Sequence, residues 1–88
     1  MQKYTATTKT VVKTESTIIE PDGYSTIEVS NIGDDTIFVN NNVPVLPGGA
    51  WTFENREYVT IAELTSIRFE GVGTTPKVLV QFIYYKEV

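Results

Sequence analysis

The apolar residues of this chain fall in short runs that alternate with polar residues, and turn residues separate the runs. Alternation with a period of two predicts β-strands with one buried face, because successive side chains of a strand point to opposite sides. No stretch repeats apolar residues with the longer period that an α-helix requires. About seven or eight strands in a chain of 88 residues are typical of one small domain. We therefore predict an all-β fold, a two-layer antiparallel sandwich of the jelly-roll or immunoglobulin type.

The beginning of the chain differs from the rest in charge and in residue type. Residues 1–14 carry three lysines and no acid, whereas residues 15–88 carry 11 acids against four bases. The segment Tyr4–Thr14 is rich in Thr and Val, which favour extended backbone because branching at Cβ restricts χ1. Neither of its faces is strongly apolar, so it is predicted to be an edge strand or an arm that pairs with another subunit. We place an extended, Thr-rich basic arm at residues 1–16 and the sandwich domain at residues 17–88.

Two strands in the first half of the domain are predicted to form a hairpin. Residues 24–30 and 36–40 both alternate, and the turn cluster 31–35 between them holds Asn, Gly and two Asp residues. These residue types favour tight turns, because Gly reaches positive φ and Asn and Asp bond to nearby backbone. The segment 62–65 is ambiguous and fits either extended chain or a single helical turn.

The last strand, residues 77–88, is the longest one predicted. Apolar side chains occupy both of its faces, so we expect it to be central and covered on both sides. Three phenylalanines, Phe38, Phe69 and Phe82, are expected to fill the core.

The chain contains no histidine and no cysteine, which removes the commonest general base, the thiol nucleophile and disulfides. Two pairs of acids are close in sequence, Asp34 with Asp35 and Glu54 with Glu57. Both pairs fall in predicted turns, where acids cap the backbone. Asp34, Asp35 and residues 40–42 offer oxygens to calcium, but their spacing does not match the twelve-residue calcium loop. We therefore expect no enzyme activity, no catalytic residue, no metal site and no cofactor.

Charge and hydropathy also narrow the choice of partner. An acidic body disfavours nucleic acid, because neutralisation of phosphates supplies most of that affinity. No run approaches the roughly 18 consecutive apolar residues of a membrane span, and residues 1–17 lack the apolar centre of a signal peptide. Small domains without disulfides or metals are often stabilised by association, so a homo-oligomer or a lattice-bound subunit is expected. Six residues are predicted to make assembly contacts: Lys3, Tyr4, Lys9, Lys13, Trp51 and Arg68.

A resemblance to a known class of proteins rests on residues 27–42 and on the segment Val45–Phe53, which reads VLPGGAWTF. The first part has a strand that ends in Asn-x-Gly and a return strand that ends near Val-Asn. The second has a Leu-Pro-Gly corner before an aromatic strand. This pattern resembles small β-sandwich structural proteins in the virions of tailed bacteriophages, and the likeness extends over residues 27–85.

The resemblance implies a structural protein of the virion that is made in the host cytoplasm. We predict an auxiliary or decoration protein that stabilises the capsid of the head, with the major capsid protein or neighbouring copies as partners. The alternative is a fibre- or tail-associated module for adhesion or carbohydrate binding. That alternative requires a contiguous exposed aromatic strip that contains Trp51 and at least one tyrosine.

Overall fold

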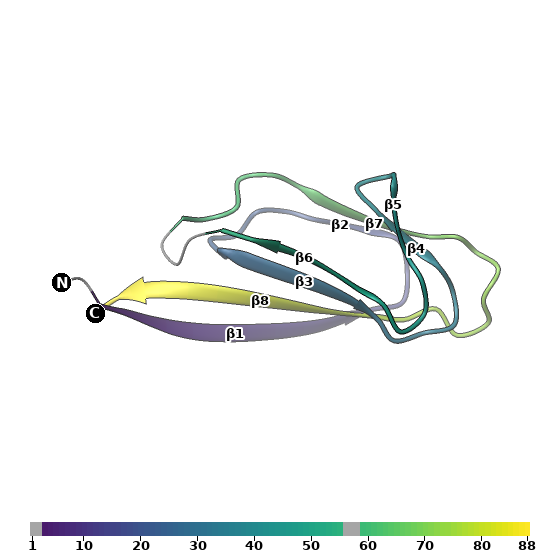
Figure 1. The fold of residues 1–88 in the computed structure, drawn as a ribbon, viewed down its shortest axis with the longest axis horizontal. Helices are drawn as coiled ribbons and strands as arrows, with labels where there is room; N and C mark the ends of the chain where they lie inside the picture. Colours follow the sequence, from purple (N-terminus) through teal and green to yellow (C-terminus); the bar gives the residue numbers. More distant parts are fainter. Residues whose placement is uncertain (1–2, 56–58) are drawn as a thin grey trace.

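The computed structural model describes residues 3–55 and 59–88, and its regular elements are strands arranged in two layers (Figure 1). The strands are β1 (Tyr4–Lys13), β2 (Thr17–Ile19), β3 (Thr26–Asn31), β4 (Ile37–Val39), β5 (Val43–Val45), β6 (Ala50–Glu54), β7 (Thr65–Phe69) and β8 (Val78–Glu87). The first sheet has the order β1-β8-β3-β6, and the second has the order β2-β7-β4-β5. All neighbouring strands are antiparallel. The predicted two-layer antiparallel sandwich is confirmed.

The chain crosses from one sheet to the other at every connection except the β4–β5 turn. This double Greek-key order is that of a jelly roll. An immunoglobulin sandwich differs, because its first two strands belong to the same sheet. No helix among the described residues is long and apolar enough to cross a membrane.

The predicted hairpin of residues 24–30 and 36–40 is wrong. β3 pairs with β6 and β8 in the first sheet, whereas β4 pairs with β5 and β7 in the second. The buried Asn31 side chain directs this crossing, since its Nδ2 donates to the carbonyls of Asp35 at 2.7 Å and Val45 at 2.9 Å. These bonds tie the end of β3 to the second sheet. The ambiguous segment 62–65 contains no helical turn, and Thr65 is the first residue of β7.

The core lies between the two sheets and is built from the inward positions of the strands. Its buried apolar residues are Ile19, Tyr24, Ile27, Val29, Ile37, Val39, Val45, Ile61, Ile67, Val78, Val80 and Phe82. Phe69 packs partly buried against them. Phe38 does not fill the core as predicted, because the inward positions of β4 are taken by Ile37 and Val39. Phe38 instead lies half-buried on the outside of the second sheet.

β8 is central, between β1 and β3, but only one of its faces is covered. Val78, Val80 and Phe82 are buried against the second sheet. Leu79, Ile83 and Tyr85 alternate with them and are only half-buried, and no third layer covers them within the part of the chain that the structure describes. The expectation of cover on both sides is therefore wrong, because an apolar outer face and a covered one have the same sequence pattern.

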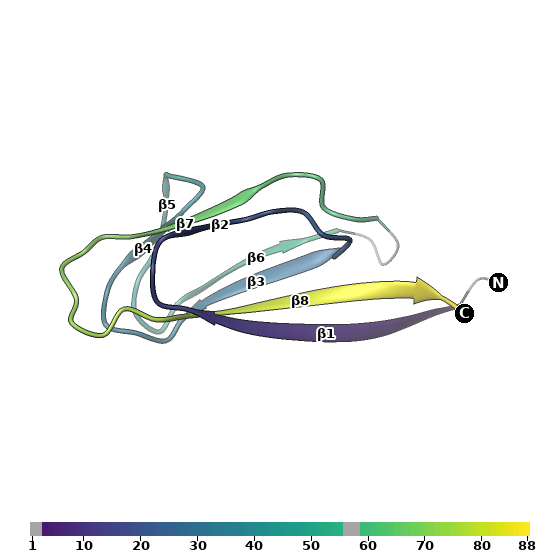
Figure 2. The ribbon, with the colours of Figure 1, turned by 180° about the vertical axis from the view of Figure 1, so that it is seen from behind.

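The N-terminal segment forms β1, an edge strand that pairs with β8 from Tyr4–Glu87 to Lys13–Val78. Of the two alternatives for this segment, the structure shows the edge strand. β3 pairs with β8 only as far as Ile83, so the far halves of β1 and β8 continue as a two-stranded ribbon. Figure 2 shows this ribbon projecting from the sandwich, which lengthens the molecule to 50 × 19 × 17 Å.

Candidate functional site

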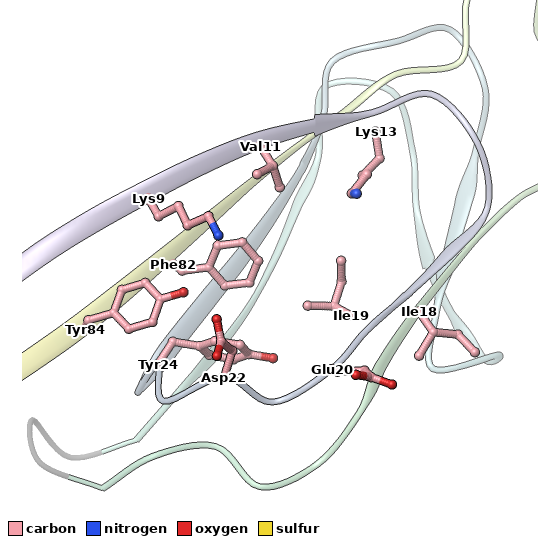
Figure 3. A pocket seen from close by; sticks show the side chains of 10 residues that line it. All are labelled: Lys9, Val11, Lys13, Ile18, Ile19, Glu20, Asp22, Tyr24, Phe82 and Tyr84. Carbon is pink, nitrogen blue, oxygen red and sulfur yellow. The ribbon is translucent and has the colours of Figure 1, made fainter.

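A cleft of about 360 Å³ opens at the edge of the sandwich between β1 and β2 (Figure 3). Three segments form its walls: the inner side of β1, the inner side of β8, and β2 with the connection that follows it. The lining residues are Lys9, Val11, Lys13, Ile18, Ile19, Glu20, Asp22, Tyr24, Phe82 and Tyr84. The cleft is at the lower end of the volumes that small-molecule sites occupy.

The β1 wall is basic. Lys9, Val11 and Lys13 lie opposite Phe82, Val80 and Val78, which are buried, so all three point to the inner side of the sheet. Figure 3 shows the amino groups of both lysines directed into the cleft. Val11 lies between them and packs against the core.

The floor of the cleft is aromatic. The ring centroid of Tyr24 is 4.8 Å from that of Phe82 and 6.3 Å from that of Tyr84, which it meets edge to face. Tyr24 is fixed by its backbone, because its carbonyl accepts a 2.8 Å hydrogen bond from the Ile61 N–H. The three rings give the cleft a rigid apolar base.

The Tyr24 hydroxyl is buried and has no hydrogen-bond partner among the described residues. Burial raises the pKa of Tyr24 above its ordinary value, and Tyr84 and Asp22 add to the rise. The Thr65 hydroxyl lies close enough to oppose this rise, although the two hydroxyls do not have the geometry of a hydrogen bond. Burial and Asp22 also raise the pKa of Tyr84.

The wall opposite β1 is acidic. Glu20 and Asp22 lie on the exposed connection between β2 and β3, where Gly23 has a φ of 83° and follows Pro21 and Asp22 in a turn. Charges of both signs thus surround an apolar floor. This arrangement suits recognition of a partner that offers both apolar surface and charge.

Asp34 and Asp35 have a structural role, as predicted for acids in turns. The buried Asp35 carboxylate accepts backbone hydrogen bonds from Gly71 at 2.8 Å, Gly73 at 3.2 Å and Val72 at 3.4 Å. The Asp34 carboxylate accepts bonds from the Thr75 N–H at 2.7 Å, the Thr74 hydroxyl at 2.8 Å and the Thr74 N–H at 2.9 Å. Both acids thereby hold the connection between β7 and β8.

These hydrogen bonds, that of Thr75 foremost, hold the pKa of Asp34 below its usual value. The described residues contain no cluster of three or more acids that could hold a metal ion. Glu57, the partner of Glu54 in the second acid pair, lies outside the described residues.

The six predicted assembly residues do not form one site. Lys9 and Lys13 meet in the cleft, whereas Lys3 and Tyr4 lie at the tip of the ribbon. Trp51 is on β6 at the opposite edge of the first sheet, where its side chain turns inward, half-buried, 6.3 Å from the Phe53 ring. Arg68 is exposed on the second sheet, with its guanidinium 4.4 Å from the centroid of the Phe38 ring.

Of the cleft residues, Lys9 and Lys13 were predicted to make contacts and Phe82 to fill the core, whereas those on β2, on the β2–β3 connection and at Val11 and Tyr84 were not singled out. The alternation of β8 does place Phe82 and Tyr84 on one face, together with Val78. No signal in the sequence, however, indicates that this face lies opposite Lys9.

The free edge of β1 borders the cleft. In an antiparallel pair, alternate residues exchange backbone hydrogen bonds. The Val88 N–H donates to the Lys3 carbonyl at 2.9 Å, so the odd-numbered residues of β1 are the ones bonded to β8. The backbone groups of Ala6, Thr8, Thr10 and Val12 therefore face away from β8, where the sheet has no further strand among the described residues.

No protein-family model matches this chain, and no curated protein matches it in sequence. The geometry of the cleft and of the β1 edge therefore carries the functional argument.

Proposed function

We propose that this chain is a non-enzymatic structural protein of a bacteriophage particle, and that it serves as an auxiliary or decoration protein of the capsid. It stabilises the head because binding to the assembled lattice adds contacts that free subunits lack. The observation that carries the proposal is the free edge of β1, which offers backbone donors and acceptors over a ten-residue strand. Such an edge is a ready template for a strand from another chain.

The outer face of the first sheet, the side turned away from the second sheet, supports the same proposal. The strand registers place Val12, Leu79 and Ile83 on it among threonines, and Val12 is 48% exposed. Its charged residues within the described segments are Glu28 and Glu54, both toward β6, and Glu87 at the far end of β8. A broad face with little charge is typical of the centre of protein interfaces.

The test is sedimentation of phage particles from a lysate of the producing cells, with the chain followed by a specific antiserum. We expect the chain to travel with the particles at a constant copy number, and with heads after heads and tails are separated. Particles that lack the chain are expected to lose their contents at a lower temperature. Recovery of the chain as a monomer at the top of the gradient would overturn the proposal.

A carbohydrate-binding module remains the alternative, but its sugar site is the cleft and not the aromatic strip that the sequence predicted. Trp51 turns toward the core, and Tyr4 and Tyr85 lie on the opposite side of the sheet, so the expected strip of Trp51 with a tyrosine does not form among these residues. The cleft favours the alternative in another form, since rings and carboxylates together can hold a sugar. Saturation-transfer NMR with a panel of hexoses tests it; a signal that Tyr84→Ala removes would support this function.

A further inference from the structure

The side chains beside the free edge of β1 set what a partner strand must offer. Lys9, Val11 and Lys13 all bond to β8 through their backbone, so toward the open edge they occupy the non-hydrogen-bonded positions. A strand added antiparallel would approach most closely at these positions, about 4.5 Å between Cα atoms. Side chains that face each other there interact most strongly.

These three residues form a basic–apolar–basic series that points into the cleft. Lys9 and Lys13 lie four residues apart, about 13 Å along the strand. Val11 lies between them and borders the aromatic floor. We infer that the β1 edge binds an extended strand with the pattern acid–x–apolar–x–acid, whose acids pair with the two lysines and whose apolar side chain enters the cleft. The inference rests on the proposed function, because it specifies the partner of that same edge.

The partner is a different polypeptide rather than a second copy of this chain. The chain has 11 acids, and no two of them are four residues apart, so no strand of a second copy carries the pattern. Pairing of β1 with another β1 would bring lysines near lysines, and lysines on an edge strand oppose such self-pairing. Glu20 and Asp22 on the far wall are exposed and repel an acidic strand that lies on their side of the cleft.

The experiment uses the whole chain and three nine-residue threonine peptides. The first carries Glu at positions 3 and 7 and Val at position 5. The second has Lys in place of both Glu residues, and the third has both Glu residues moved by one position, onto the other face. We expect the first peptide to bind at least about tenfold more tightly than the other two in a calorimetric titration. We also expect it to slow amide exchange at Thr8, Thr10 and Val12.

Two proline variants locate the binding edge. Thr10→Pro removes an N–H that faces the open edge, so it blocks an added strand while the β1–β8 ladder keeps its hydrogen bonds. Thr52→Pro is the matched control, because Thr52 occupies the equivalent position on the free edge of β6. We expect Thr10→Pro to abolish binding of the first peptide and Thr52→Pro to retain it.

A charge variant provides a second readout that does not alter the backbone. Lys9→Glu with Lys13→Glu is expected to reverse the preference, so that the lysine peptide binds more tightly. Lys77→Glu with Lys86→Glu changes the net charge equally outside the cleft and should leave the preference unchanged.

Three results would overturn the inference: equal binding of the three peptides, full binding by Thr10→Pro, or a dimer in light scattering that Thr10→Pro dissociates. The last result would make a second copy the occupant. If no peptide binds but the chain still sediments with particles, the strand pattern is wrong and the proposed function stands. If the first peptide binds as expected but the chain does not sediment with particles, the virion role fails and the edge specificity stands.

Discussion

The Asp35 Oδ2 atom accepts a 2.8 Å hydrogen bond from the backbone N–H of Gly71, and this bond joins the β3–β4 connection to the β7–β8 connection. The two residues are 36 positions apart in the chain. Together with Asn31, Asp35 forms a buried polar centre where the chain passes between the sheets. Buried groups of this kind are costly to leave without partners.

Replacement of Asp35 by Asn is expected to lower the free energy of unfolding by about 2 kcal/mol, because one carboxylate oxygen that accepts backbone bonds is lost in a buried site. Urea denaturation measures this. Asp34→Asn is the control, because Asp34 makes similar bonds in an exposed position. An equal loss in the two variants would contradict the role of burial.

The ionisation of Asp34 should make the free energy of unfolding depend on pH in acidic solution. The pKa of Asp34 is held below its ordinary value by hydrogen bonds from Thr75 and Thr74, so the folded state favours the ionised carboxyl. A depressed folded pKa contributes stability above the unfolded value, and this contribution is lost as the pH falls through the folded value. We expect the difference in unfolding free energy between the parent chain and Asp34→Asn to shrink below about pH 4. A difference that stays constant from pH 7 to pH 2 would refute this.

Tyr24→Phe is expected to stabilise the protein by about 1 kcal/mol, because it removes a buried hydroxyl that has no hydrogen-bond partner among the described residues. The variant should also resist alkali better. Because burial raises the pKa of Tyr24 in the folded state, the parent chain keeps its full stability below pH 10 and loses stability as the pH rises from there through the folded value. Thermal unfolding at pH 7 and pH 11 measures both effects. Tyr84→Phe, at a half-exposed position, should change stability at pH 7 little; a loss of stability in Tyr24→Phe at pH 7 would show that the hydroxyl has a partner.

Gly33→Ala should destabilise the protein by about 2 kcal/mol or more. An added Cβ would collide with the backbone of Thr75 and Lys77, which belongs to the neighbouring connection and has little room to move. Gly23→Ala is a useful comparison, because that site has open space and only its positive φ opposes alanine. Its cost should be about 1 kcal/mol, and Gly23→Asn should recover part of it. Equal stability of Gly33→Ala and the parent chain in urea would contradict the close approach.

The sequence identifies which face of a strand is buried more reliably than which strand lies beside it. Alternation placed Ile27 and Val29 on one face of β3, and both are fully buried. It could not reveal that β3 and β4 belong to different sheets, because a strand buries one face in either arrangement. The crossing is held by contacts that local patterns do not contain, such as the Asn31 hydrogen bond to Val45, 14 residues away.

The residues that meet in the cleft likewise could not be predicted from the sequence. Lys9 was singled out for its charge, but its neighbour Phe82 lies 73 positions away and is set opposite it by the register of β1 and β8. The position of Arg68 over the Phe38 ring likewise follows from the pairing of β4 with β7. Local patterns contain no information on such registers, whereas turn acids such as Asp34 and Asp35 could be assigned from residue type alone.

The position of β8 has a consequence for synthesis of the chain. This strand leaves the ribosome after β1–β7, yet it lies between β1 and β3, so the first sheet has a gap at its centre until residue 87 has emerged. Contacts of such long sequence separation form slowly, because the intervening loop must be ordered first. The edges of β1 and β3 that pair with β8 must therefore stay free of other strands in the nascent chain until β8 has emerged.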